Sequence, residues 1–175
     1  MITIDDTVKG NLQIAKMIKN HDLESETIFF CDFPDNKSRE IIKKLSDMGF
    51  EIGSHTMSHS KLYRAPIDLM EYELKTSKRE IEDITGKKCR WFAYPYGQYT
   101  NLYVEAVKKA GYKFARTCNK RFINDYKRSC FELSGKNWEK AQTKKYPIYQ
   151  IHYYNLERNN SFEQFNKFLE WYGKN

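Results

Sequence analysis

The sequence predicts a single α/β domain over residues 1–175, built as a short or distorted (β/α) barrel. Two observations lead to this fold class. Short apolar segments alternate with longer amphipathic segments along most of the 175 residues. A closed eightfold barrel typically takes about 250 residues, so an incomplete barrel fits a chain of this length better. An open doubly wound sheet is the alternative, although the sequence contains no glycine-rich nucleotide-binding loop.

The first half of the chain contains three expected strands with two amphipathic helices between them. Short apolar runs predict the strands, at residues 1–5, 27–31 and 50–54. Apolar residues at helical spacing predict the helices, at residues 7–20 and 36–48. Gly49 follows the second helix directly, as is typical of a helix end.

The second half continues the alternation. Its longest helix, over residues 66–85, opens on Pro66 and ends at Gly86, which is the usual asymmetry. The remaining expected elements, in chain order, are a strand at 90–94, a helix at 101–110, a strand at 112–116, a strand at 146–154 and a helix at 161–172. Residues 117–145 are polar and irregular and remain unassigned. This order predicts parallel strands with right-handed crossovers.

Composition and charge exclude several classes of protein. The net charge is +7, but Lys and Arg are interleaved with Glu and Asp, as in KTSKREIEDITGKK. This pattern is typical of solvated helix surfaces, so we expect no nucleic-acid partner. No apolar run approaches 18 residues, so no membrane span is expected. No signal peptide precedes MITIDD, which favours a cytoplasmic location. The sequence carries no signal for an oligomeric state.

Polar residues follow several of the expected strands, at the point where each strand ends. Asp5 and Asp6 end the first strand, His55 and His59 follow the third, and His152 lies near the end of the last one. The carboxyl ends of parallel strands meet on one rim of such a fold. We therefore expect these side chains to converge.

Two imidazoles and one carboxylate are a common ligand set for a catalytic divalent metal, and Asp6, His55 and His59 supply it. The spacing of four between the histidines would place both rings on one side of a helical turn. Metal-bound water ionises near neutral pH, Asp5 could take its proton, and His152 could protonate a leaving group. The alternatives are that Asp6 caps the next helix and that the histidines are packing residues.

Four motifs in chain order resemble those of the polysaccharide deacetylase family of the NodB-homology type. They are TIDD (3–6), HTMSH (55–59), YPYG (94–97) and IHYYN (151–155), and the resemblance extends over residues 2–172. It implies a distorted (β/α) barrel, often seven-stranded. It also implies an enzyme that removes acetyl groups from N-acetylated, sometimes O-acetylated, sugars. An N-acetylated glycan or glycan precursor is the partner that follows from it.

The resemblance also implies a role for individual residues. Asp5 would be the catalytic base, and His152 the acid that protonates the departing amine. Asp6, His55 and His59 would bind a divalent ion, most often zinc, with cobalt, nickel or another divalent ion as alternatives. The backbone N–H of Tyr96 would help to stabilise the oxyanion. Aromatic and proline residues beside the motifs could contact sugar faces, and these are Tyr94, Pro95, Tyr99 and Tyr153.

The chain departs from the family pattern at three places. Thr7 follows Asp6, where the family usually has glycine. Ala93 and Tyr94 stand where many members carry an arginine that orients the base, and only Trp138 is a candidate for the fourth motif. What orients Asp5 is therefore open. Two further functions stay open as well: hydrolysis of another C–N amide or imide bond, and glycan binding without catalysis.

Overall fold

The computed structural model describes residues 1–118, 133–134, 136–137 and 148–174. Within them, eight strands form one sheet in the order β6-β5-β4-β3-β2-β1-β8-β7, and every neighbouring pair is parallel. The strands are β1 (Ile2–Asp5), β2 (Thr27–Cys31), β3 (Glu51–Ser54), β4 (Trp91–Ala93), β5 (Phe114–Thr117), β6 (Leu133–Ser134), β7 (Lys136–Asn137) and β8 (Tyr149–His152).

The sheet is curled, and the position of its two edge strands requires the curl. β6 and β7 lie at opposite ends of the strand order, yet only residue 135 separates them along the chain. Two steps between neighbouring Cα atoms span at most about 8 Å, so the two edges must approach each other. The expected short or distorted barrel is confirmed. The strand count differs slightly from the seven that the family resemblance implies: the described residues form eight strands, and two of these have only two residues each.

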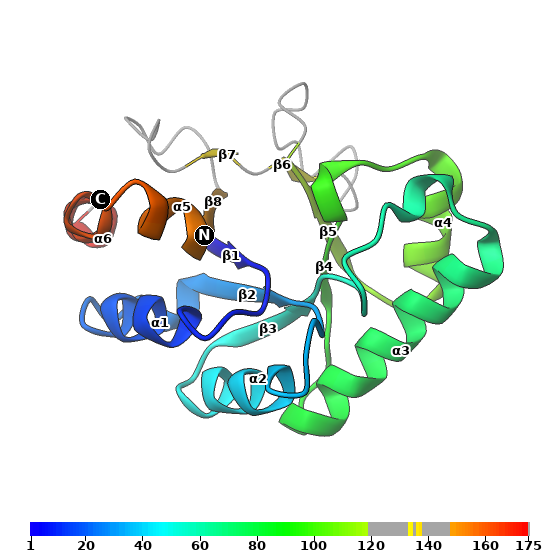
Figure 1. Ribbon diagram of the computed structural model, residues 1–175, viewed down its shortest axis with the longest axis horizontal. Coiled ribbons are helices and arrows are strands. Elements are labelled where there is room, and N and C mark those ends of the chain that lie inside the picture. The colour runs from blue at the N-terminus through cyan, green and yellow to red at the C-terminus, as the bar shows by residue number, and fades with distance from the viewer. Residues whose placement is uncertain (119–132, 135, 138–147, 175) are drawn as a thin grey trace.

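Helices cover the outside of this curled sheet (Figure 1). They are α1 (Asn11–Lys19), α2 (Ser38–Asp47), α3 (Ile67–Thr85), α4 (Asn101–Lys109), α5 (Tyr153–Arg158) and α6 (Phe162–Lys174). Two differ from the sequence-based expectation. α1 begins at Asn11 and not at residue 7. The last strand stops at His152, and α5 takes up residues that the strand prediction had included.

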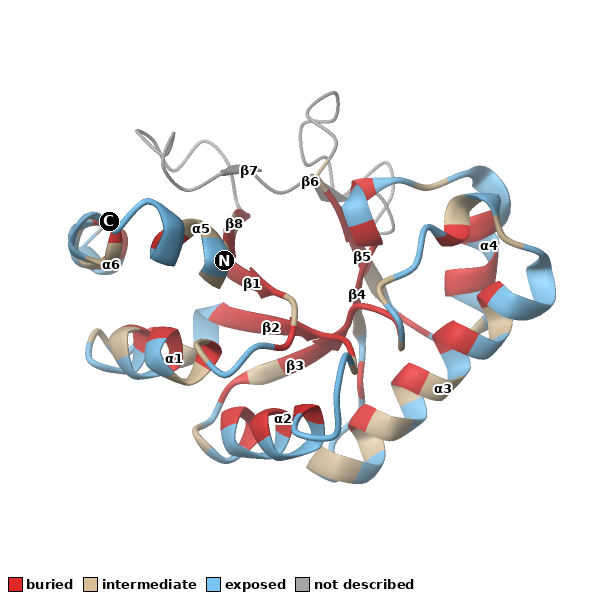
Figure 2. Cartoon of the chain, in the orientation of Figure 1, coloured by how far each residue is buried: buried red, intermediate tan, exposed pale blue. Residues whose placement is uncertain are grey.

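The two faces of the sheet have different surroundings, because successive strand residues point to opposite sides. Outward-facing apolar residues such as Ile4, Phe29 and Phe92 pack with the buried sides of the helices into one large core (Figure 2). A smaller cluster of Ile28, Phe30 and Ala93 is separate from that core. The interior of the barrel is thereby filled near β2 and β4, and polar side chains reach its carboxyl-terminal end.

None of the helices in the described part of the chain combines the length and the apolar character of a membrane span.

Gly53 in β3 packs closely against two aromatic residues of neighbouring strands, so its substitution should affect stability. A Cβ atom there would lie 2.6 Å from the Phe30 ring and 3.1 Å from Cβ of Trp91. We expect Gly53→Ala to lower the free energy of unfolding by about 1–3 kcal/mol through overpacking, measured by urea denaturation. Gly173→Ala is the control, since its nearest atom is an ordinary 3.9 Å away. Equal stability of the two variants would contradict the prediction.

Candidate metal centre

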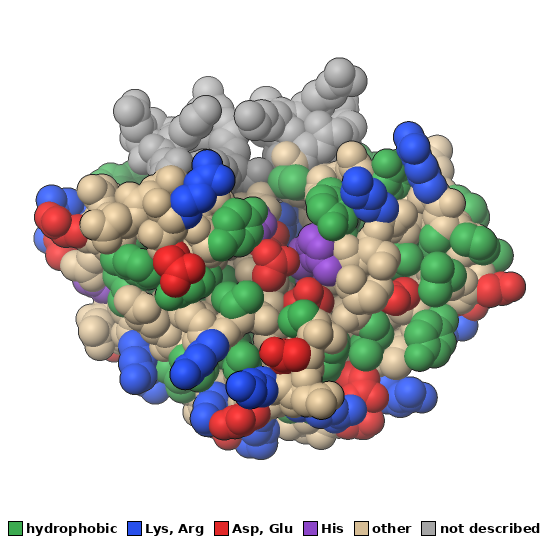
Figure 3. All heavy atoms as spheres, in the orientation of Figure 1, with side chains coloured by type: hydrophobic (Ala, Val, Ile, Leu, Met, Phe, Trp, Pro, Cys, Tyr) green, Lys and Arg blue, Asp and Glu red, His purple; other side chains and the backbone are tan. Residues whose placement is uncertain are grey.

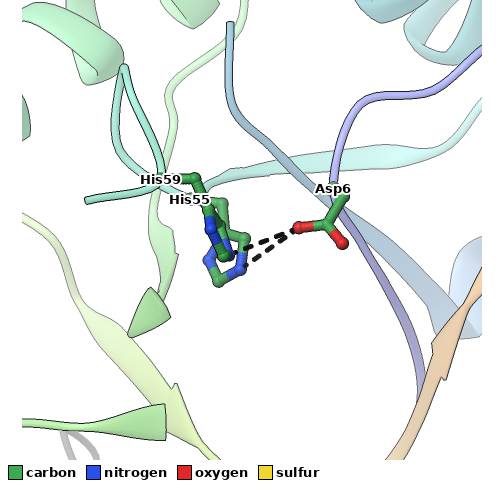
Figure 4. Close-up of side chains that lie close together, drawn as sticks. All are labelled: Asp6, His55 and His59. Atoms are coloured by element: carbon green, nitrogen blue, oxygen red, sulfur yellow. Dashed lines mark ion pairs between the residues drawn. The ribbon is translucent and has the colours of Figure 1, made fainter. Parts of the chain in front are cut away.

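Asp6, His55 and His59 converge at the carboxyl ends of β1 and β3. One ligand atom from each residue can be chosen so that all three lie within 4.8 Å of one another. Nε2 of His55 is 3.8 Å and Nε2 of His59 is 3.4 Å from the same Oδ1 of Asp6 (Figure 4). The expected convergence of these side chains is therefore present in the structure.

The loop that carries the histidines is not a helical turn, so that part of the expectation is wrong. Thr56 and His59 both have left-handed backbone conformations, with φ of 71° and 52°. These two reversals fold the loop back over the end of β3. The imidazole rings lie close together, edge to face, with their centroids 4.7 Å apart. The spacing of four residues is right for this site, but the backbone that uses it is different.

Asp5 and Asp6 serve the same site although they are consecutive. In a regular strand they would point to opposite faces of the sheet. Asp6 has a φ of 68°, which takes it out of the strand pattern and turns it toward the histidines. The next residue, Thr7, is fixed by Asp32, since its N–H donates to Oδ1 at 2.8 Å and its hydroxyl donates to the Asp32 carbonyl at 2.7 Å. A threonine therefore fits at this turn.

The protonation states of the ligand set suit a cation. Nδ1 of His55 lies 2.8 Å from the Ala93 carbonyl oxygen, which can only accept, so the proton is on Nδ1 and Nε2 is free. Burial lowers the pKa of His55 to about 4, so its ring is neutral near pH 7. Burial, and then the neighbouring charge of Asp5, raise the pKa of Asp6 to about 6. A divalent cation would reverse this effect, and the nitrogen and oxygen donors fit zinc.

Asp5 lies beside the ligand set and is held from two sides. The guanidinium of Arg116 donates to its Oδ1, and the amide of Gln150 donates to its Oδ2 at 2.9 Å. Nε2 of His152 is 3.6 Å from the same Oδ2. Burial alone would raise the pKa of Asp5, but the charge and hydrogen bond of Arg116 hold that pKa below its usual range. Asp5 is therefore ionised at neutral pH.

Arg116 answers the question of what orients Asp5. Arg116 comes from β5, whereas the family pattern places its arginine in the segment before Pro95, which follows β4 here. Arg116 and Asp5 are 1% and 2% exposed, and the guanidinium lies 5.0 Å from the centre of the Phe30 ring. The one signal in the sequence was its place at the end of an expected strand. Gln150 was missed too, although it precedes His152 by two residues and shares its face of β8.

The tyrosines near the motifs differ in their exposure to solvent. Tyr96 and Tyr154 are exposed, and their rings lie 4.7 Å from His59 and 5.1 Å from His152. Figure 3 shows histidine, acidic and hydrophobic side chains together in the middle of this face. Tyr96 also adopts a left-handed conformation, with φ of 59°. One exposed ring therefore lies beside a ligand, His59, and the other lies beside His152.

Tyr94 and Pro95 are buried, which contradicts their expected contact with a sugar. The Tyr94 ring is 1% exposed and packs edge-on against Phe92 and Tyr103 in the core. Tyr99 and Tyr153 are half-buried. Their rings pack against Tyr94 and Phe162 respectively, with centroids 5.1 and 5.9 Å apart. Trp138, the candidate for the fourth motif, lies outside the described residues.

The buried Arg116–Asp5 pair makes a prediction that is independent of activity. Arg116→Met leaves the Asp5 charge buried without its main partner, so we expect the free energy of unfolding to fall by about 3–5 kcal/mol. The double variant with Asp5→Asn removes both charges and should recover part of that loss. Chemical denaturation of the single and double variants measures both effects. A cost below about 1 kcal/mol for Arg116→Met would show that the pair contributes little.

Sequence comparison finds deacetylases among the relatives of this chain. The chain is 26% identical over 131 residues to the peptidoglycan deacetylase of Helicobacter pylori, covering 75% of this chain and 43% of that protein. It is 26% identical over 102 residues to the peptidoglycan-N-acetylmuramic acid deacetylase PdaA of Bacillus subtilis, covering 58% and 38%. The chain thus spans less than half the length of these relatives.

A solved structure shares the fold. It is a mutant of BA3943 from Bacillus anthracis, described as a CE4 family pseudoenzyme with restored enzymatic activity. It superposes with a TM-score of 0.71 at 21% identity, covering 97% of this chain and 62% of that one. The family model for polysaccharide deacetylase matches residues 1–115, and this chain therefore belongs to the polysaccharide deacetylase family.

Proposed function

We propose that this chain is a metal-dependent hydrolase that removes acetyl groups from an N-acetylated sugar in a glycan or glycan precursor. One observation carries the proposal: three ligand atoms within 4.8 Å of one another lie beside Asp5, a carboxylate that Arg116 keeps ionised. The bound cation, zinc most readily, would supply Lewis acidity and an activated water. Asp6, His55 and His59 would hold it.

The protein's own groups divide the proton transfers between them. Asp5 is ionised and buried, so it is suited to take the proton of the attacking water. His152 lies 3.6 Å from Asp5, so its imidazole can protonate the departing amine beside the base. The backbone N–H of Tyr96 would donate to the developing oxyanion. Each of these groups comes from a different strand end or loop, which is consistent with assembly of the site by the fold.

The exposed rings support a sugar as the substrate. Tyr96 and Tyr154 present apolar faces with polar tips beside His59 and His152, a combination that suits the mixed surface of a pyranose. The names of the relatives suggest a peptidoglycan-type glycan. The alternative of glycan binding without catalysis rested on two weakened motifs, the missing arginine and the unclear fourth motif. For the first of these, Arg116 places a cation beside Asp5. Hydrolysis of another amide or imide bond remains the second candidate.

His55→Ala tests the cation. We expect the purified protein to bind about one equivalent of zinc and this variant to lose it, because two ligands hold zinc far more weakly than three. Elemental analysis after dialysis measures the content. His21→Ala is the matched control, since His21 lies 3.0 Å from Asn166 and is not part of the ligand set. Full zinc content in His55→Ala would exclude the proposed centre.

Asp5→Asn tests the base. We expect acetate release from N-acetylated glycan oligomers to fall by at least about 100-fold because the proton acceptor is removed. Zinc should stay bound, since Asp5 is not one of the three ligands. Enzymatic assay of acetate gives the rate, and circular dichroism checks the fold. Undiminished turnover would refute the mechanism. A panel that includes cyclic imides separates the two candidate reactions, and chelator-insensitive sugar binding without turnover would favour a binding domain.

A further inference from the structure

We propose that Glu73, on α3, is a positioning residue that holds the loop of residues 55–60 in the shape that lets His55 and His59 share a cation. This inference rests on the proposed metal-dependent function. It assigns a role to a residue that lies on another element from both histidines and is not itself one of the ligands.

Both oxygens of the Glu73 carboxylate accept hydrogen bonds from the loop. Its Oε2 accepts hydrogen bonds from the backbone N–H groups of Met57, at 2.8 Å, and Ser58, at 3.0 Å. Its Oε1 accepts from the Ser58 hydroxyl at 2.8 Å. Glu73 is 6% exposed, and no lysine or arginine of the described ranges forms an ion pair with it. A buried carboxylate needs such donors to offset its desolvation, so loop and carboxylate depend on each other.

The loop needs an external partner because its own conformation is unfavourable. Thr56 is β-branched and has a φ of 71°, and His59 has a φ of 52°. Backbone of this kind persists only where surrounding contacts over-determine it. Two of the contacts are local: the Thr56 N–H reaches Ser54 Oγ at 3.2 Å, and the His59 N–H reaches Thr56 Oγ1 at 3.0 Å.

Glu73 differs from these local partners because it belongs to a 19-residue helix that is packed against the sheet. It therefore ties the loop to a rigid element, whereas Ser54 and Thr56 only shape it. The two histidines depend on this tie unequally. His55 is also fixed by the Ala93 carbonyl, while His59 is 26% exposed and contacts Tyr96 at the surface. Loss of Glu73 should release mainly His59, and the cation should bind more weakly without being lost.

The test compares three variants of the full chain. Glu73→Ala removes all three acceptor contacts. Glu73→Gln keeps an oxygen for the two backbone N–H groups, and its amide can donate to the Ser58 hydroxyl. Glu82→Ala is the matched control, because Glu82 also lies on α3 and accepts a backbone N–H, that of Cys89 at 3.1 Å. Zinc affinity is measured by competition with a chromophoric chelator, and the cobalt absorption spectrum reports the ligand geometry.

We expect Glu73→Ala to bind zinc about 10–100-fold more weakly, with an altered cobalt spectrum, which is the range usual for residues that orient metal ligands without binding the metal. Glu73→Gln should bind nearly as well as the parent, and Glu82→Ala should be unchanged. Hydrogen exchange on the metal-free protein should show faster exchange at Met57 and Ser58 in Glu73→Ala alone. This loop measurement needs no metal.

The outcomes separate the two proposals. Parental zinc affinity and unchanged amide exchange in Glu73→Ala would overturn the role of Glu73. An equal loss of affinity in Glu82→Ala would reduce it to general stability of α3, and would overturn it as well. If the parent protein binds no zinc or cobalt, the proposed function fails, and the exchange rates still decide whether Glu73 holds the loop. If Glu73→Ala does not fold, Glu73→Asp, which is shorter by one methylene, replaces it with the same expected outcomes.

Discussion

The ion pair between Arg116 and Asp5 is the contact on which the site depends. β5 and β1 are separated by three other strands, which in a flat sheet would place them about 19 Å apart. The Arg116 side chain nevertheless contacts Asp5, because the curl of the sheet brings the two strands closer together. The pair in turn keeps a carboxylate charged in a buried position. Together with burial, that charge raises the pKa of Asp6 next to it.

Much of the fold and part of the site could be predicted from local sequence. Alternation of apolar runs with amphipathic segments located the main strands and helices, and the ends of the strands located Asp5, Asp6 and the histidines. Arg116 could not be found in this way, because its partner is distant in sequence and the contact depends on curvature. The loop after β3 was also misjudged, since helical spacing at His55 and His59 does not reveal the backbone reversals between them.

Unfavourable backbone conformations are concentrated around the ligand set. Among the described residues, six other than glycine have positive φ, and four of them are Asp6, Thr56, His59 and Tyr96. Each of these four carries or directly adjoins a group that the proposed chemistry uses. Such conformations cost free energy, so the surrounding contacts must compensate, as Asp32 does for the turn at Thr7 and Glu73 for the histidine loop. The fold is therefore less stable than it could be, because strained backbone at one rim orients the side chains of the site.

The position of β1 leaves no freedom in its alignment. It is hydrogen-bonded to β2 on one side and to β8 on the other, and all four of its residues are buried. A slip by a single residue would turn Ile4 toward Arg116 and push Asp5 among the apolar side chains beneath the helices. Only the correct pairing of β1 therefore places Asp5 beside Arg116. A chain that misaligns here buries the Asp5 carboxylate without a counter-charge. The same error that destabilises the fold therefore also removes Asp5 from the site.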